Sequence, residues 1–235
     1  AGGLAAEGYE VHLVELAGWL MPAQLDEGGG NLLNRLIEQR GIQLHTGVSL
    51  EQVLPRIEKR RGNESDEAAI NANATNVAGV ALSDGSKLEA DLVCLAVGIR
   101  PRDELGKVNG FEMGPRGGIM VGQDCKTSHP NVWAIGEVAA MEGRCIGLVA
   151  PANTMAEVVV DRLLGGKAVF GEVDGSTKLK LSGIDVASFG DAKGAEKDSL
   201  DVVYADPTRG IYQRLVMSPD ATTPVSYTHL RAHET

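Results

Sequence analysis

Carboxylates and glycines that directly follow apolar runs are the first candidates for chemistry in this sequence. Glu15 lies at the end of the run EVHLVEL, Gly98 follows DLVCLAV, and Gly136-Glu137 follows NVWAI. Carboxyl ends of buried strands are the places where doubly wound α/β sheets bind ligands. Glycine there lets a ligand approach the backbone. The simpler interpretation is solvated acids at the two carboxylates and an ordinary turn at Gly98.

A second candidate is the start of a helix. The segment GLVAP, residues 147–151, leads into a helix expected from about Asn153 to Leu164, with Asn153 as its N-cap. The positive end of a helix favours negative charge on a ligand. The interpretation without a ligand is a purely structural cap.

The elements that position these residues form three blocks. Residues 1–99 predict an α/β unit with a helix at 30–40, a strand at 42–46 and a hairpin around 77–89. An enlarged polar hairpin loop is expected at 58–76, and a strand buried on both faces at 91–97. Residues 100–166 predict strands at 117–121 and 131–135 before the second helix. Residues 167–223 alternate like a small α+β domain, with strands near 177–181, 184–188, 202–204 and 211–212.

Both ends of the sequence depart from this pattern. In a βαβ dinucleotide unit the acidic residue lies about 20 positions after the glycine fingerprint, whereas only 14 residues precede Glu15. Residues 224–235, PVSYTHLRAHET, resemble the translation of a sequencing-library adapter, so we expect them to be non-native and outside the fold. We therefore expect a reading frame truncated at both ends, and a chain that is inactive alone.

Composition narrows the function classes. The formal net charge of −10 argues against a basic surface for nucleic acid or anionic membranes. No apolar run approaches the roughly 18 residues of a membrane span, and no signal peptide opens the chain. Three cysteines without a CxxC pair favour buried thiols in a reducing cytoplasm over disulfides or a metal site.

The ordered motifs EVHLVEL, DLVCLAVGIRP and VWAIGE resemble the pyridine nucleotide–disulfide oxidoreductase superfamily of flavoproteins. Within it, Gln24-Leu25-Asp26, GLVAP, STKLKLSGIDVASFGD (176–191) and YADPTRGIYQRLV (204–216) are similar to the family of NAD(P)H-dependent nitrite reductase large subunits. The electron-transfer subunits of assimilatory nitrate reductases are also similar. The resemblance covers about residues 1–223.

The resemblance implies a fold of two dinucleotide-binding, Rossmann-like parts, both incomplete, followed by the small α+β domain. It implies FAD and NAD(P)H as cofactors, with electrons leaving to iron–sulfur or siroheme centres beyond residue 223, to a small redox protein, or to a small subunit as partner.

It also implies roles for single residues. Glu15 would accept hydrogen bonds from the adenine ribose hydroxyls and repel a 2′-phosphate, so that NADH is preferred. Gly98 would let the backbone approach the nicotinamide half. Gly136 and Glu137 would lie at the FAD ribitol, where much of the superfamily has aspartate. Four residues would bring a helix N-terminus to the flavin pyrimidine: Ala150, Pro151, Asn153 and Thr154.

Three alternatives stay open on the sequence. One is the electron-transfer subunit of an assimilatory nitrate reductase. A stand-alone NADH-dependent reductase of rubredoxin or ferredoxin type shares the same parts without a siroheme half. A non-catalytic NADH-binding module is the rival from another class, and the Gly136-Glu137 and GLVAP pair argues against it because a sensor needs no flavin site.

Overall fold

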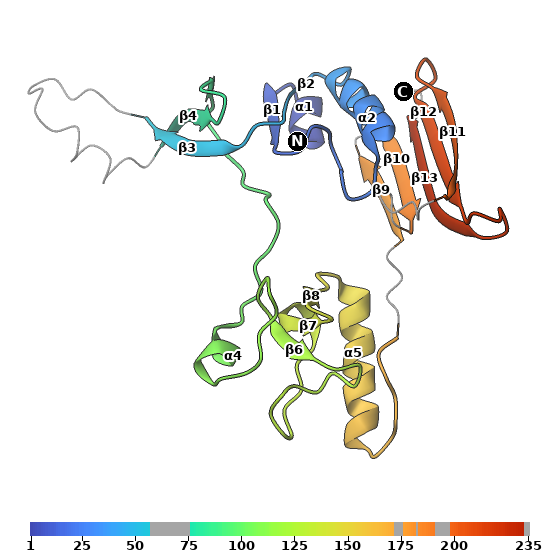
Figure 1. Ribbon diagram of the computed structural model, residues 1–235. Coiled ribbons are helices and arrows are strands. Elements are labelled where there is room, and N and C mark those ends of the chain that lie inside the picture. Colours follow the sequence, from blue (N-terminus) through green and yellow to red (C-terminus); the bar gives the residue numbers. More distant parts are fainter. Residues whose placement is uncertain (57–75, 172–175, 182, 191–197, 233–235) are drawn as a thin grey trace, which may run out of the picture. The chain divides into compact units, whose positions relative to one another are not determined.

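The computed structural model describes residues 1–56, 76–171, 176–181, 183–190 and 198–232. It is an α/β protein, as predicted. Contacts divide it into two compact units, Ala1–Cys94 with Gly175–Thr235 (unit 1) and Leu95–Asp174 (unit 2) (Figure 1). The predicted domain boundaries at 99 and 166 stay predictions. In the described part of the chain, no helix is long and apolar enough to cross a membrane.

Unit 1 begins with a βαβ arrangement. After α1 (Gly2–Ala6), strand β1 (Val11–Glu15) pairs in parallel with β2 (Ile42–Thr46), and helix α2 (Glu27–Glu38) connects them. The predicted helix and second strand are confirmed, although α2 starts three residues earlier than expected. Its apolar face buries a leucine and isoleucine set that packs on both strands and on the C-terminal sheet: Leu32, Leu33, Leu36 and Ile37.

The predicted hairpin is confirmed, but the apolar run after it is not a strand. Strands β3 (Leu50–Pro55), β4 (Val77–Leu82) and β5 (Lys87–Glu89) form an antiparallel sheet. The expected polar loop at 58–76 lies outside the described residues except for Asn76. Residues 91–97 have no strand partner among the described residues, and Val97 is 89% exposed. An apolar run becomes a strand only when a neighbouring backbone satisfies its hydrogen bonds, so the prediction of a buried strand is wrong here.

The C-terminal sheet is antiparallel, with the strand order β11-β12-β13-β10-β9. Its strands are β9 (Thr177–Leu181), β10 (Ile184–Phe189), β11 (Leu200–Asp206), β12 (Ile211–Met217) and β13 (Pro224–Ala232). The predicted strands of this block are therefore confirmed as β9 to β12. One face of the sheet packs on α2 in a shared core that includes Ile184, Val186, Tyr212 and Leu230.

The expectation that residues 224–235 lie outside the fold is wrong for 224–232. They form β13, a central strand that pairs with both β10 and β12. The physical reason is a period-two pattern: Ser226, Thr228 and Leu230 are buried on the α2 face while their neighbours are not. Without this strand, β10 and β12 would face each other with unpaired edges. The adapter-like origin of these residues stays a prediction.

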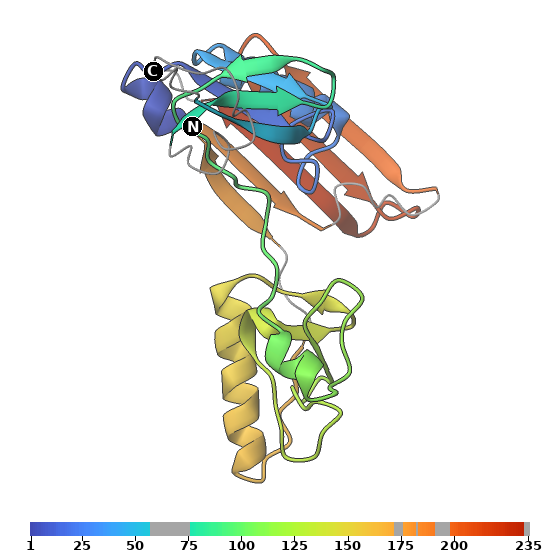
Figure 2. The same cartoon turned by 90° about the vertical axis from the view of Figure 1, so that its left-hand side faces the viewer.

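Unit 2 packs helix α5 (Val149–Leu163) along a small sheet of β6 (Ile119–Val121), β7 (Ala139–Met141) and β8 (Arg144–Cys145) (Figure 2). Helix α4 (Glu104–Val108) precedes the sheet, and a 3₁₀ turn, η1 (Gly136–Val138), leads into β7. The core contains Val121, Cys125, Ala139, Met155, Val158 and Phe170. The strand expected at 131–135 is reduced to one bridge between Lys126 and Trp133.

Candidate functional site

Glu15 occupies the carboxyl end of β1, as predicted. Its Oε1 accepts a hydrogen bond from the backbone N–H of Ala17 at 2.8 Å, and the side chain is half-buried. This bond holds the carboxylate over the turn that leaves the strand. Among the described contacts Oε2 has no protein partner, so one carboxylate oxygen is available to a ligand hydroxyl.

The loop after Glu15 is held against α2. The backbone N–H of Leu20 donates to Asn34 Oδ1 at 3.0 Å, and Trp19 Nε1 donates to the carbonyl oxygen of Leu25 at 3.1 Å. We call residues 16–25 the strand-end loop. These two hydrogen bonds, one to Asn34 of α2 and one between two residues of the loop, hold the loop beside Glu15.

In unit 2, Gly98 has the left-handed backbone conformation that favours glycine, with φ +92°. A Cβ added at Gly98 would meet nothing within 4 Å, so the backbone is open to a ligand there. The next residue, Ile99, lies against Gly147, where a Cβ would come within 3.2 Å of Ile99 Cδ1. This contact brings the Gly98 segment to the start of α5.

Gly136 and Glu137 also lie close to the start of α5. Gly136 has φ +75°, and a Cβ there would lie 3.8 Å from the Cβ of Ala152 in α5. Glu137 is exposed at the first turn of η1. The structure therefore brings Gly98, Gly136-Glu137 and the α5 N-terminus together within unit 2, while Glu15 belongs to unit 1.

Helix α5 begins earlier than the sequence suggested. Leu148 is its N-cap, with no side-chain cap hydrogen bond, so the prediction of Asn153 as N-cap is wrong. A proline at the third helical position explains the shift, because the first turn needs no N–H from Pro151. Ala150 and Pro151 lie in the first turn. Asn153 and Thr154 fall in the second turn, where Thr154 Oγ1 donates to the carbonyl oxygen of Ala150 at 3.3 Å.

This helix start has the electrostatics of an anion-accepting site. With no side chain capping the helix, the amides of Val149 and Ala150 have no intrahelical partner. The first turn carries no acidic residue, and both residues are exposed. The positive end of a 15-residue helix is thus open to an electron-rich ligand atom.

Comparison with known proteins assigns the family. The model of the pyridine nucleotide-disulphide oxidoreductase family matches residues 1–157. The chain belongs to this family. It is 41% identical over 224 residues to the large subunit of the NADH nitrite reductase of Escherichia coli, covering 95% of this chain and 24% of that protein. It therefore spans about a quarter of this relative's length.

Two further comparisons agree with the assignment to this oxidoreductase family. The assimilatory nitrate reductase electron transfer subunit of Bacillus subtilis is 30% identical over 223 residues, covering 94% of this chain and 26% of that protein. The crystal structure of an FAD-dependent pyridine nucleotide-disulphide oxidoreductase from Desulfovibrio vulgaris superposes with a TM-score of 0.75 at 25% identity. It covers all of this chain and 56% of the other.

The site residues of this oxidoreductase chain fit a flavin nucleotide on two observations. Gly136 has a positive φ that an L side chain rarely adopts, and beside it only the Cβ of Ala152, at 3.8 Å, would meet an added Cβ, so a ligand can approach the backbone there. The uncapped amides of α5 supply donors for the electron-rich edge of a flavin.

Sequence reasoning missed Asp103, a buried carboxylate in unit 2. Its carboxylate is buried and accepts from the Gly118 N–H at 2.7 Å, while Lys107 Nζ lies 2.7 Å away. Hydrogen bonds from Lys107 and from Gly118 lower the pKa of Asp103 below its ordinary value. The sequence could have predicted this ion pair, because Asp103 and Lys107 are four residues apart at the start of a helix. Ile99 was also missed, and no sequence pattern identifies it.

Proposed function

We propose that this chain is the NADH- and FAD-binding electron-input part of an NAD(P)H-dependent nitrite reductase. The observation that carries the proposal is the convergence of Gly136-Glu137 with the open N-terminus of α5. The 41% identity to a nitrite reductase large subunit supports the same assignment.

When bound, FAD supplies the redox chemistry, taking a hydride from NADH and releasing electrons singly. Glu137 accepts hydrogen bonds from the ribitol hydroxyls, and Gly136 keeps the approach to the backbone open. Ala150 and Pro151 present the helix end to the flavin pyrimidine, where the positive dipole stabilises negative charge. Asn153 and Thr154, one turn further on, support this helix end.

Glu15 selects the pyridine nucleotide in this proposal. Its free Oε2 accepts a hydrogen bond from an adenine ribose hydroxyl, and its charge repels a 2′-phosphate, so NADH is preferred over NADPH. Gly98 gives the nicotinamide half access to the backbone. In the same proposal residues 1–99 form the NAD(P)-binding domain, 100–166 the C-terminal part of the FAD-binding domain, and 167–223 the small C-terminal domain.

In this proposal the electrons pass from the flavin to iron–sulfur and siroheme centres of the nitrite reductase. A small redox protein as acceptor is the rubredoxin- or ferredoxin-reductase alternative, and a small subunit is a further partner. We place the protein in the cytoplasm. The described cysteines are all free thiols, as expected in that compartment, although Cys94 is exposed and the prediction that all three are buried is wrong.

The test uses the protein expressed from its complete gene. We expect bound flavin whose absorbance bleaches on anaerobic addition of NADH and recovers on addition of nitrite. Recovery with rubredoxin or ferredoxin but not with nitrite would instead indicate the stand-alone reductase. Nucleotide binding by a protein without flavin would contradict the proposal and favour a non-catalytic NADH-binding module.

A further inference from the structure

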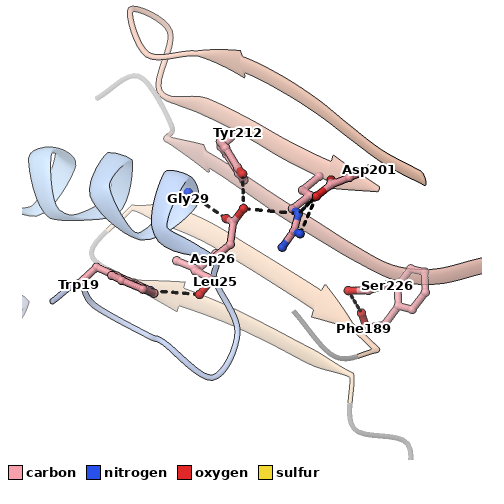
Figure 3. A network of polar contacts seen from close by, with 9 residues as sticks. Trp19, Leu25, Asp26, Gly29, Phe189, Asp201, Tyr212 and Ser226 are labelled. Carbon is pink, nitrogen blue, oxygen red and sulfur yellow. Dashed lines mark hydrogen bonds and ion pairs between the residues drawn. The ribbon is translucent and has the colours of Figure 1, made fainter. Parts of the chain in front are cut away.

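Two motifs that are far apart in the sequence meet in unit 1. Asp26, from Gln24-Leu25-Asp26, and Tyr212, from YADPTRGIYQRLV, are joined by a hydrogen bond from Tyr212 Oη to Asp26 Oδ2 at 2.7 Å (Figure 3). The other oxygen, Asp26 Oδ1, accepts from the Gly29 N–H at 3.1 Å and caps α2. A single carboxylate therefore connects the start of α2 to the C-terminal sheet.

Arg214 extends the network on the same face of β12. Its Nε lies 3.5 Å from Asp26 Oδ2, and its Nε and Nη2 donate to Asp201 at 3.0 and 2.6 Å. The side chains of Arg214 and Asp26 are 15% and 23% exposed, so water screens their attraction only in part. Hydrogen bonding to Asp201 raises the pKa of Arg214, and burial together with Asp26 raises the pKa of Tyr212. Tyr212 thus stays protonated and remains a donor.

The first turn of α2 depends on these contacts because three of its first four residues are glycines. Gly28, Gly29 and Gly30 each lower helix stability relative to alanine. A Cβ on Gly28 or Gly29 would lie 3.1 Å from the Tyr212 ring, and one on Gly30 would lie 2.0 Å from Trp19 Cδ1. The glycines therefore make room for two aromatic rings, which support a turn that is weak on its own.

The strand-end loop connects this turn to Glu15. Its last residue, Leu25, is fully buried and accepts the hydrogen bond from Trp19, and Asp26 follows directly. Movement of the first turn of α2 would therefore displace the loop at its anchored end. The other end of the loop is the turn that holds the Glu15 carboxylate.

We propose that Tyr212 and Arg214 are positioning residues for nucleotide binding. Acting through Asp26, they hold the first turn of α2 and with it the strand-end loop beside Glu15. The C-terminal sheet then sets the affinity for NADH without contacting the nucleotide. This inference rests on the proposed role of Glu15 in binding NADH.

The test compares Tyr212→Phe, Asp26→Ser and the double variant in the protein expressed from its complete gene. Serine keeps an N-cap for α2 but removes the acceptor for Tyr212. Tyr204→Phe is the matched control, because Tyr204 is 52% exposed on β11 and its register partner Gln213 places it on the opposite face. The measurements are amide hydrogen exchange of residues 16–30, and KM and kcat for NADH.

We expect amides of residues 16–30 to exchange about tenfold faster in Tyr212→Phe, and KM for NADH to rise about three- to tenfold with kcat nearly unchanged. Tyr212→Phe should add little in the Asp26→Ser background, since both changes break the same connection. The control should match the wild type in both measurements.

The outcomes separate this inference from the proposed function. A Tyr212→Phe variant with wild-type exchange and KM would refute the positioning role while NADH-dependent flavin reduction stands. Additive effects of Tyr212→Phe and Asp26→Ser would also refute it, because Tyr212 would then act by another route. A wild-type protein that does not respond to NADH would contradict the proposed function, whatever the exchange of residues 16–30.

Discussion

Replacing Gly30 by alanine tests how tightly the first turn of α2 packs. Helix propensity alone predicts that Gly30→Ala stabilises α2 by about 1 kcal/mol. The structure predicts the opposite sign, because the new Cβ would lie 2.0 Å from Trp19 Cδ1 and 2.4 Å from Trp19 Cγ. Contacts this short force the indole to move.

The expected change in the free energy of unfolding combines two costs with the gain in helix propensity. Overpacking a filled site costs about 1–3 kcal/mol. A displaced Trp19 also loses its hydrogen bond to the Leu25 carbonyl oxygen, now 3.1 Å long, which contributes about 0.5–1.5 kcal/mol. We therefore expect the free energy of unfolding of unit 1 to fall by about 1–3 kcal/mol.

The assay is urea unfolding followed by tryptophan emission in a Trp133→Phe background, so that Trp19 alone reports on unit 1. Gly3→Ala in α1 is the matched control, because a Cβ there meets nothing within 4 Å. The control should be neutral or gain up to about 1 kcal/mol. A Gly30→Ala variant as stable as the wild type, with unchanged Trp19 emission, would refute the packing argument.

Three further predictions concern the two units separately. Glu15→Ala combined with Leu16→Arg should shift the kcat/KM ratio toward NADPH by about tenfold or more, because arginine accommodates the 2′-phosphate; steady-state kinetics with both nucleotides measures it. Glu137→Ala should weaken FAD binding about tenfold through lost ribitol hydrogen bonds, measured by flavin fluorescence titration. The pKa of Asp103 is lower when folded, so its stabilisation exists above the ordinary carboxyl pKa and is lost as pH falls through the lowered value. In the Asp103→Asn variant, the free energy of unfolding of unit 2 should therefore fall less steeply as the pH is lowered. Trp133 emission measures this unfolding.

One of these predictions has a matched control, and a result that would contradict each of the other two can be named. Glu157→Ala, on the exposed side of α5, should leave FAD affinity unchanged. A Glu15→Ala, Leu16→Arg variant that keeps its NADH preference would remove Glu15 from nucleotide selection. An Asp103→Asn variant whose acid unfolding matches the wild type would show that the contacts of this carboxylate add no pH-dependent stability.

Local patterns in the sequence predicted the elements whose neighbours are close in the chain. The apolar face of α2, the strand β2 and the C-terminal hairpins follow from period and turn residues alone. The strand-end position of Glu15 was predicted in the same way. Gly136-Glu137 was expected at the end of a buried strand, but the structure has a single bridge there and a 3₁₀ turn at Gly136–Val138. These features depend on residues that are close together in the chain, so a single sequence is enough to predict them.

The errors concern long-range pairing and caps. Residues 91–97 have the composition of a buried strand, but strand formation depends on a neighbouring strand. Residues 224–232 resemble a sequencing adapter, yet their alternating buried and more exposed side chains form a strand that pairs with both β10 and β12. Asn153 is a good N-cap by residue type, but Pro151 lets α5 start earlier. The contact between Asp26 and Tyr212 spans 186 residues, and no local pattern indicates it.

The central claim is that Glu15 binds the pyridine nucleotide while Glu137 and the start of α5 hold the flavin. A crystal structure of the protein expressed from its complete gene, soaked with NADH, tests it most directly. We predict the Glu15 carboxylate within hydrogen-bond distance of the adenine ribose hydroxyls, and the flavin pyrimidine against the amides of Val149 and Ala150. NADH bound away from Glu15, or a flavin with no contact to Glu137 and α5, would contradict the account.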